Sequence, residues 1–278
     1  MADVRHPFFA SPRPLVFAHR GGSGLAPENT IEAFDNGLAL GADGLELDVH
    51  LSRDGTVVVH HDLTLDRTTN GRGRISAHTA DELARLDAGY QFQRDGFHPY
   101  RGRGIGVPTL AALLARHRGA RVIVELKVDL PELAAAAIEA VRHADAVDRV
   151  CFGSSWRGVL RAVRALEPAI ATSAAREEVR WALYRSWCRW PVRRPPYAGF
   201  QVPEWSGGTR VVSRRFVEMA HRANLGVHVW TVDKEGDARR LLEWGVDGLI
   251  TDRPDVIIPI AQGFNRLEPL EPIRRAES

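Results

Sequence analysis

The first apolar run of the chain ends in residues that can move protons and bind anions. We predict a strand over Leu15–His19, and it runs directly into Arg20, Gly21 and Gly22. An imidazole at a strand end can exchange protons near neutral pH. A guanidinium offers a fork of donors to a phosphate group. Taken alone, this motif is equally compatible with a surface turn that carries incidental charge.

A second strand, predicted over Gly44–Leu51, carries an alternating row of polar side chains. Glu46, Asp48 and His50 alternate with Leu45, Leu47 and Val49, so the polar residues share one face of the strand. Buried carboxylates are costly unless they are paired or bind a metal, and hard cations prefer oxygen ligands. The row therefore indicates a cation site, with a solvated edge strand as the alternative. We assign His50 no catalytic role.

Three further strand ends carry candidate residues. A run predicted as a strand over Val57–His60 leads into His61, and alternation places only one of His60 and His61 toward a site without saying which. Glu125 and Lys127 share a face at the end of another strand, as a metal ligand beside a phosphate contact or as a simple ion pair. His228 and Trp230 share a face in the same way, and Trp230 either lines a pocket or fills the top of the barrel.

The elements that must position these residues alternate between strands and helices. This order favours a parallel sheet with crossover helices, and the number of units favours a single eight-stranded TIM-type (β/α)8 barrel. The irregular segment from about residue 62 to 106 is predicted to be a small insertion at the carboxyl-terminal face. Residues 190–209 are predicted to be a strand flanked by loops. The predicted strands are Leu15–His19, Gly44–Leu51, Val57–His60, Arg121–Lys127, Arg149–Phe152, Ala169–Thr172, Gly199–Val202, Gly226–Thr231 and Gly248–Thr251, and the predicted helices are Thr30–Leu40, Ala80–Leu86, Thr109–His117, Pro131–Ala144, Arg157–Leu166, Glu177–Trp190, Ser213–Ala223 and Lys234–Trp244. Asp252 is expected to cap a final helix.

Composition limits the class of protein. The 278 residues are 44% hydrophobic and 26% charged, with a net charge of +2, which gives no support to a nucleic-acid partner. The two cysteines, Cys151 and Cys188, indicate no disulfide framework. The sequence shows no signal peptide and no membrane span, so we expect a cytoplasmic protein. The first strand is not followed by a dinucleotide-binding fingerprint, which disfavours an oxidoreductase.

One stretch, residues 179–190, mixes aromatic residues with arginines. Membrane-surface helices have this composition, and transient contact with a membrane is one interpretation. We favour the other interpretation, an outer barrel helix whose Trp and Leu side chains pack against the strands.

Taken in order, these motifs resemble the glycerophosphodiester phosphodiesterase family, one of the phosphatidylinositol phospholipase C-like barrels. The resemblance runs from about residue 15 to 256 of a single catalytic domain, 1–278. The matching stretches are His19-Arg20-Gly21, Pro27-Glu28-Asn29-Thr30, Glu46-Leu47-Asp48-Val49, Asp54-Gly55 with His61-Asp62, Leu65-Asp66-Arg67-Thr68-Thr69, Pro108-Thr109-Leu110, Glu125-Leu126-Lys127, Val229-Trp230-Thr231-Val232 and Asp247-Gly248-Leu249-Ile250-Thr251-Asp252.

The resemblance implies a hydrolase that converts a small glycerophosphodiester into glycerol 3-phosphate and an alcohol. It implies a divalent ion, Ca²⁺ or Mg²⁺, held by Glu46, Asp48 and Glu125. It selects His61 over His60 as the catalytic partner of His19, with His19 as base and His61 as acid, and with water or the glycerol 2-hydroxyl as nucleophile. Arg20 and Lys127 would contact the phosphate, and Trp230 the glycerol or head group. The alternatives are a lysophospholipase D-like enzyme with lipid substrates and a non-catalytic barrel that binds phosphate esters.

Overall fold

The computed structural model describes residues 5–264 and shows a ring of parallel strands. Neighbouring strands follow the order β6-β5-β4-β2-β1-β11-β10-β7. A parallel bridge between Ser173 and Gly199 joins the two ends of this order, so the sheet is nearly closed into a barrel. The ring consists of β1 (Leu15–His19), β2 (Gly44–Leu51), β4 (Arg121–Leu126), β5 (Val150–Gly153), β6 (Ala171–Thr172), β7 (Gly199–Pro203), β10 (Gly226–Trp230) and β11 (Gly248–Thr251).

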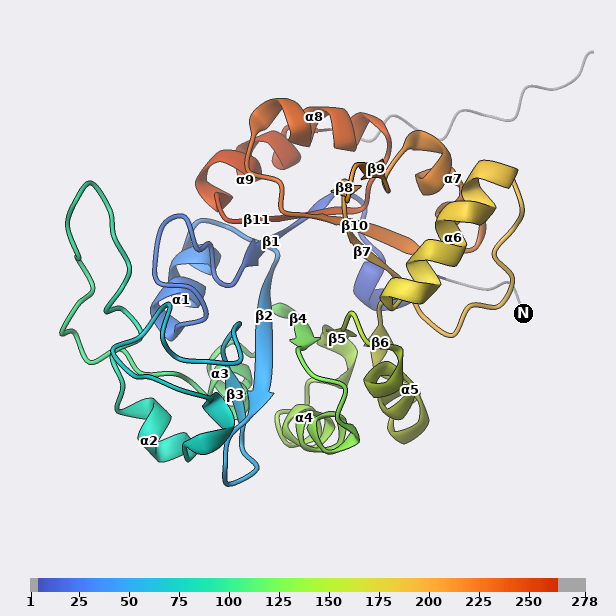
Figure 1. Cartoon of the computed structure of the whole chain (residues 1–278). Coiled ribbons are helices and arrows are strands. Elements are labelled where there is room, and N and C mark those ends of the chain that lie inside the picture. Colours follow the sequence, from blue (N-terminus) through green and yellow to red (C-terminus); the bar gives the residue numbers. More distant parts are fainter. Residues whose placement is uncertain (1–4, 265–278) are drawn as a thin grey trace, which may run out of the picture.

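Helices surround this ring, and an α-helix follows each of its strands along the chain (Figure 1). The side chains of Thr30, Thr109 and Ser213 begin three of these helices, each accepting a hydrogen bond from a backbone N–H of the first turn. The predicted TIM-type barrel is therefore confirmed within the described residues. The outer helices are α1 (Ile31–Ala39), α3 (Leu110–Arg116), α4 (Pro131–His143), α5 (Arg157–Leu166), α6 (Arg176–Cys188), α7 (Arg214–Arg222), α8 (Glu235–Glu243) and α9 (Pro254–Gln262).

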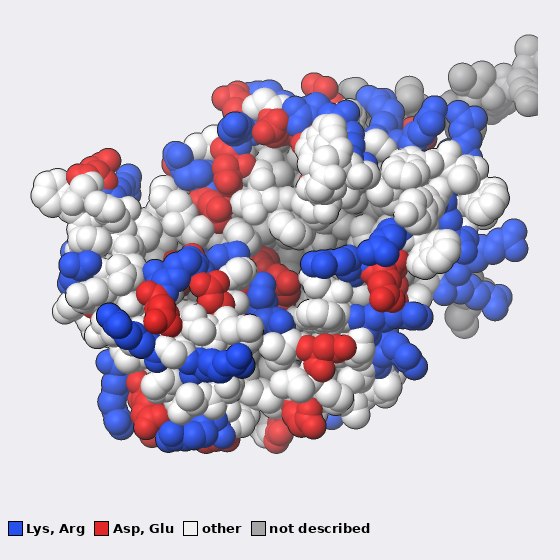
Figure 2. All heavy atoms as spheres, in the orientation of Figure 1, with Lys and Arg blue, Asp and Glu red and all other residues white. Residues whose placement is uncertain are grey.

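The alternation of β2 separates the core from the site. Leu45, Leu47 and Val49 are fully buried and belong to one apolar cluster with side chains of α1, α3 and α4. Because successive side chains of a strand point to opposite faces, Glu46 and Asp48 lie inside the barrel. The face of the molecule seen in Figure 2 is hollowed at its centre, and charged side chains of both signs gather there.

Two phenylalanines close the amino-terminal end of the barrel. Phe8 and Phe9, in the short 3-10 helix η1 (Pro7–Phe9), are buried against Phe17. A Cβ atom at Gly199 or Gly226 would lie 2.6 or 2.4 Å from the Phe9 side chain. The missing side chains at these two glycines therefore make room for the Phe9 ring.

Asp247 ties the amino-terminal segment to the barrel wall. Its buried carboxylate accepts a hydrogen bond from the backbone N–H of Val227 and pairs with Arg5 at 2.6 Å and His221 at 2.9 Å. Burial opposes the charge of Asp247, but these partners outweigh burial and hold the pKa of this carboxyl below its usual range.

The segment between β2 and α3 is an insertion with its own small core. β3 (Val57–Val59) pairs antiparallel with β2 and lies outside the ring, and η2 (Ile75–Ala77) and α2 (Ala80–Ala84) follow it. Its apolar cluster consists of Val58, Leu65, Ile75, Leu83, Ala88, Ile105 and Val107. The prediction of one domain over residues 1–278 stays a prediction, since residues 1–4 and 265–278 lie outside the described part of the chain.

Two sequence-based expectations need correction. The segment predicted as a strand flanked by loops, residues 190–209, ends in a hairpin of β8 (Trp205–Ser206) with β9 (Thr209–Arg210). Gly207 and Gly208 form its two-residue turn with φ of 53° and 79°, a conformation that favours glycine.

The second correction concerns α6. The residues of α6 that are buried are Ala182, Leu183 and Ser186. Trp181 falls on the opposite side of the helix and Trp187 at its flank, one turn after Leu183, and they are 67% and 52% exposed. The expectation that the tryptophans of this helix pack against the strands is wrong, whereas Leu183 belongs, with Ala182, to the apolar cluster that contains Phe200 and Val202 of β7. None of the helices in residues 5–264 is long and apolar enough to cross a membrane.

Candidate active site

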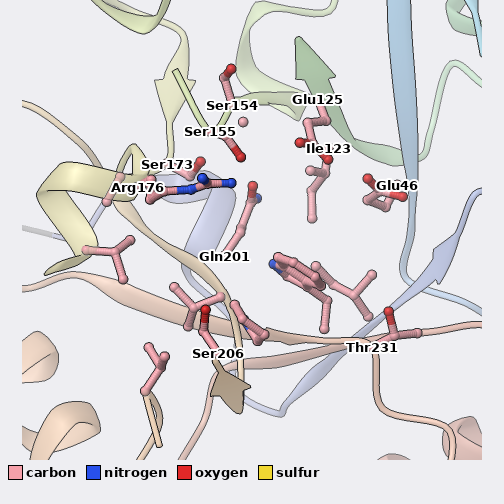
Figure 3. Close-up of a pocket in the computed structure, with 18 of the residues that line it drawn as sticks. Glu46, Ile123, Glu125, Ser154, Ser155, Ser173, Arg176, Gln201, Ser206 and Thr231 are labelled. Carbon is pink, nitrogen blue, oxygen red and sulfur yellow. The ribbon is translucent and has the colours of Figure 1, made fainter. Parts of the chain in front are cut away.

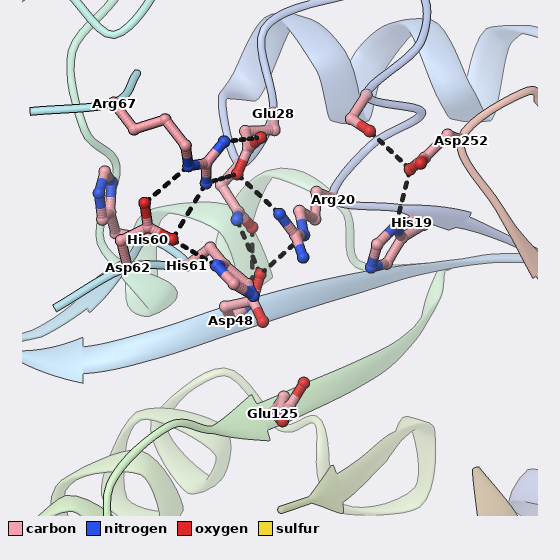
Figure 4. Close-up of polar contacts among 12 residues, drawn as sticks. His19, Arg20, Glu28, Asp48, His60, His61, Asp62, Arg67, Glu125 and Asp252 are labelled. Atoms are coloured by element: carbon pink, nitrogen blue, oxygen red, sulfur yellow. Dashed lines mark hydrogen bonds and ion pairs between the residues drawn. The ribbon is translucent and has the colours of Figure 1, made fainter. Parts of the chain in front are cut away.

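His19 ends β1 and is held by a carboxylate from the far end of the chain. His19 Nδ1 lies 2.7 Å from Asp252 Oδ1, which also accepts a hydrogen bond from Ser23 Oγ at 2.5 Å (Figure 4). His19 Nε2 lies 3.7 Å from a Glu46 carboxylate oxygen. Burial alone would lower the pKa of His19, but the charges of Glu46 and Asp252 outweigh burial and raise it to about 9.

Asp252 therefore differs from its predicted role as a helix cap. The cap position of α9 is Arg253, and it makes no side-chain capping hydrogen bond. The Asp252 carboxylate instead fixes the orientation of the His19 ring. This contact could not be predicted from local sequence patterns, because the two residues are 233 positions apart.

Arg20 follows His19 in a tight turn and is bound by carboxylates. Its φ is 51°, and the next residue, Gly21, has φ of 89° with no room for a Cβ, which would lie 2.6 Å from Ala33. The Arg20 guanidinium contacts Glu28 at 2.9 Å and Asp48 at 3.3 Å. These contacts hold a cationic side chain at the edge of the acidic row.

Three carboxylates converge inside the barrel. Asp48 on β2 stands in register with Glu125 on the neighbouring strand β4, and Glu46 precedes Asp48 on the same face. One oxygen from each of the three lies within 4.8 Å of the others. Burial, together with the charges of Asp48 and Glu125, raises the pKa of Glu46 to about 8. Lys127 reaches this cluster, with Nζ 3.2 Å from Asp48 and 3.5 Å from Glu125.

The structure distinguishes the two adjacent histidines that alternation left equivalent. β3 ends at Val59, so neither histidine belongs to a regular strand. His60 is buried and contacts the backbone oxygen of Thr64. His61 lines the cavity, and its Nδ1 lies 2.6 Å from Asp62 Oδ1.

An ion-pair network holds Asp62, the carboxylate that contacts His61. Arg67 contacts Asp62 at 2.6 Å and Glu28 at 2.7 Å, and Glu28 in turn contacts Arg20 (Figure 4). Glu28, Asp62 and Arg67 lie in motifs that carried the family resemblance, yet they were given no role. These three residues contact one another only in the folded protein, where the insertion packs beside the turn that follows β1.

These side chains line one cavity of about 740 Å³ at the mouth of the barrel. Trp230 ends β10 at this mouth and is 42% exposed, whereas His228 is buried among the rings of Phe9 and Phe17. The predicted residues on the cavity wall are His19, Arg20, Glu46, His61, Glu125, Lys127 and Trp230, with Asp48 buried beside them.

The opposite wall of the cavity is polar and was not anticipated. Ser155, Ser173 and Gln201 line it, and Arg176 extends toward Gln201 from the start of α6 (Figure 3). These residues come from loops, from β7 and from the start of α6, and the sequence around them contains no recognisable motif.

Comparison with protein families gives a match over residues 19–256 to the glycerophosphoryl diester phosphodiesterase family. The chain belongs to this family. The matched range contains every predicted site residue of the glycerophosphoryl diester phosphodiesterase barrel, and the expected enzyme class is confirmed.

Curated relatives and solved structures agree with this assignment. The chain is 33% identical to a glycerophosphodiester phosphodiesterase of Caldanaerobacter subterraneus, over 90% of this chain and 98% of the relative. It is 31% identical to a glycerophosphodiester phosphodiesterase of Bacillus subtilis, over 91% of this chain and 88% of the relative. A phosphodiesterase of Oleispira antarctica, solved with the product sn-glycerol-3-phosphate, matches with a TM-score of 0.73 and 29% identity over 90% of this chain and 98% of its own. These relatives favour neither the lipid-specific nor the non-catalytic alternative.

Proposed function

We propose that the chain hydrolyses small glycerophosphodiesters to glycerol 3-phosphate and an alcohol, with His19 and His61 as its acid–base pair. The observation that carries this proposal is the matched arrangement of the two histidines on one cavity. Each has its Nδ1 held by a carboxylate at 2.6–2.7 Å, so each can present Nε2 to a substrate. The relative solved with glycerol 3-phosphate supports the choice of product.

The acidic cluster fits a divalent cation, Ca²⁺ or Mg²⁺. Glu46, Asp48 and Glu125 offer oxygen ligands within 4.8 Å of one another, and burial together with the charges of Asp48 and Glu125 raises the pKa of Glu46, which a bound cation would oppose. When bound there, a divalent ion would neutralise charge on the phosphoryl oxygens.

The chain's own residues bind the diester and move the protons. Arg20 and Lys127 place positive charge beside the acidic cluster, where the phosphate would lie. One histidine removes a proton from the attacking water or glycerol 2-hydroxyl, and the other donates a proton to the oxygen of the departing alcohol. We assign the first step to His19 and the second to His61. A cation bound by Glu46 would offset the charge that raises the pKa of His19 and so favour the neutral imidazole that a base requires. Trp230, at the mouth, would contact the glycerol or head group.

The proton steps are tested with two substrates that differ in their leaving group. Glycerophosphocholine needs a proton on its departing alkoxide, whereas a p-nitrophenyl glycerophosphate does not. We expect His19→Ala to lose about 10²–10⁴-fold in kcat with both substrates, and His61→Ala to lose that much only with glycerophosphocholine.

The control is His60→Ala, adjacent to His61 in the chain but outside the cavity, with folding checked by circular dichroism. A histidine variant that keeps the native rate with both substrates would remove that residue from the mechanism. The opposite substrate pattern would reverse the acid and base assignments. Detection of a cyclic phosphate by ³¹P NMR would identify the glycerol 2-hydroxyl as the nucleophile.

A further inference from the structure

A ridge of aromatic side chains runs along the outer face of α6. Trp181, Tyr184 and Trp187 follow one another at helical spacing, and Trp190 lies just beyond the helix end. Trp181 and Tyr184 have ring centroids 6.1 Å apart, and Tyr184 and Trp187 have centroids 5.6 Å apart, both edge to face. All four side chains are exposed, Trp181 and Trp190 by 67% and 65%. Adjacent exposed aromatics of this kind mark interaction surfaces.

The same part of the chain is strongly basic. Residues 179–203 contain five arginines and no acidic residue. The arginines are Arg180, Arg185, Arg189, Arg193 and Arg194. Within residues 5–264, none of the five forms an ion pair with a carboxylate, unlike Arg164 on the neighbouring helix, which pairs with Glu178 at 2.8 Å. This surface is therefore positively charged without internal compensation.

The ridge lies beside the mouth of the barrel. Arg180, Tyr184 and Trp187 also line the catalytic cavity, so the ridge and the cavity share a border. Trp156 and Trp205 are exposed too, and they follow the carboxyl ends of β5 and β7, the strands on either side of β6. A largely uncharged surface extends above and to the right of the central hollow, with arginines and lysines around it (Figure 2).

We propose that the α6 ridge, defined by Trp181, Tyr184, Trp187 and Trp190, docks the protein on an anionic phospholipid surface with the cavity mouth beside the membrane. Trp and Tyr rings favour the boundary between water and hydrocarbon, because their apolar bodies are buried while their polar atoms stay hydrated. Uncompensated arginines are attracted to anionic head groups. The two properties occur together on one surface, which fits a lipid head-group layer better than a neutral protein partner.

The proposal is tested by co-sedimentation with vesicles of phosphatidylcholine alone and of phosphatidylcholine mixed with phosphatidylglycerol. We expect binding only to the anionic vesicles, with an affinity that falls as salt is added. Trp181→Ala/Trp190→Ala removes two ridge residues that do not line the catalytic cavity, and we expect it to weaken binding about ten-fold or more. Arg193→Gln/Arg194→Gln should weaken binding by at least about five-fold, since each arginine near an anionic membrane contributes about that factor.

Matched controls are Phe97→Ser and Arg161→Gln. Phe97 is an exposed aromatic residue of the insertion, which lies across the ring from α6, and Arg161 lies on α5 outside the cavity (Figure 1). Both controls should bind vesicles as the native protein does, and all four variants should hydrolyse a soluble diester at the native rate. Vesicle binding needs no turnover, so this surface and the proposed hydrolysis are tested separately.

Three results would overturn the proposal. The first is absence of native binding to anionic vesicles at low salt. The second is undiminished binding by both ridge and arginine variants. The third is self-association that Trp181→Ala/Trp190→Ala abolishes in the absence of any vesicle binding, which would assign the ridge to a second copy of this chain.

Discussion

The contact between Asp252 and His19 predicts a specific kinetic defect. A carboxylate can only accept hydrogen bonds, so Asp252 selects the tautomer in which His19 Nδ1 carries the proton and Nε2 stays available to the substrate. In Asp252→Asn the side chain keeps its shape, but its amide can donate to Nδ1 and select the opposite tautomer.

The size of the effect follows from the position of Asp252, which contacts His19 Nδ1 but does not line the cavity. An acid–base group contributes about 10²–10⁴-fold to the rate, and loss of an outer partner that orients a functional histidine costs about 10–100-fold. We therefore expect Asp252→Asn to lower kcat about 10–100-fold. Because Asp252 is not on the cavity wall, KM should stay within about two-fold of the native value.

The assay is steady-state release of glycerol 3-phosphate from glycerophosphocholine at saturating divalent ion. Asp255→Asn is the matched control. Asp255 lies in the first turn of α9, pairs with Arg253 and does not line the cavity. A native kcat in Asp252→Asn, or an equal loss in Asp255→Asn, would refute the positioning role.

Three further outcomes are expected. Removal of divalent ions with EDTA should abolish hydrolysis, and full activity in metal-free buffer would contradict the cation site formed by the three carboxylates. Asp247→Asn should lower the free energy of unfolding by about 3 kcal/mol in urea titrations, because it breaks a buried network of charged partners. Since the pKa of Asp247 is lowered in the folded state, this stabilisation is present above the unfolded pKa of about 4 and is lost as the pH falls below it, so native protein and variant should converge in stability in acid. Phe9→Ala should lower the free energy of unfolding by about 3–5 kcal/mol while leaving kcat unchanged, because Phe9 fills the end of the barrel away from the cavity.

The barrel could be predicted because its strands follow simple rules. The alternation from Leu45 to Val49 places the acidic residues on one face, and parallel strands bring Glu125 beside Asp48. Site residues at the carboxyl ends of strands were found for the same reason.

What was missed depends on long-range packing. Alternation alone could not distinguish His60 from His61, which only the family resemblance separated, because β3 ends one residue earlier than predicted. The role of Asp252 depends on a contact across almost the whole chain. The tryptophans of α6 were wrongly predicted to be buried. Aromatic and apolar residues occur around most of this helix, so their spacing does not indicate which side is buried.

The active site is built from two parts, the barrel and the insertion, which we expect to differ in local stability. His19 belongs to the barrel, whose clusters are large, whereas Asp62 and Arg67 belong to a segment with a core of only seven buried apolar residues. Segments with small cores open at lower free energies than the rest of a protein. Amide hydrogen exchange should therefore be faster in residues 62–106 than in β1 and β2, and heat should inactivate the enzyme before the barrel unfolds. A loss of activity with temperature would then report reversible opening of the insertion rather than denaturation of the protein.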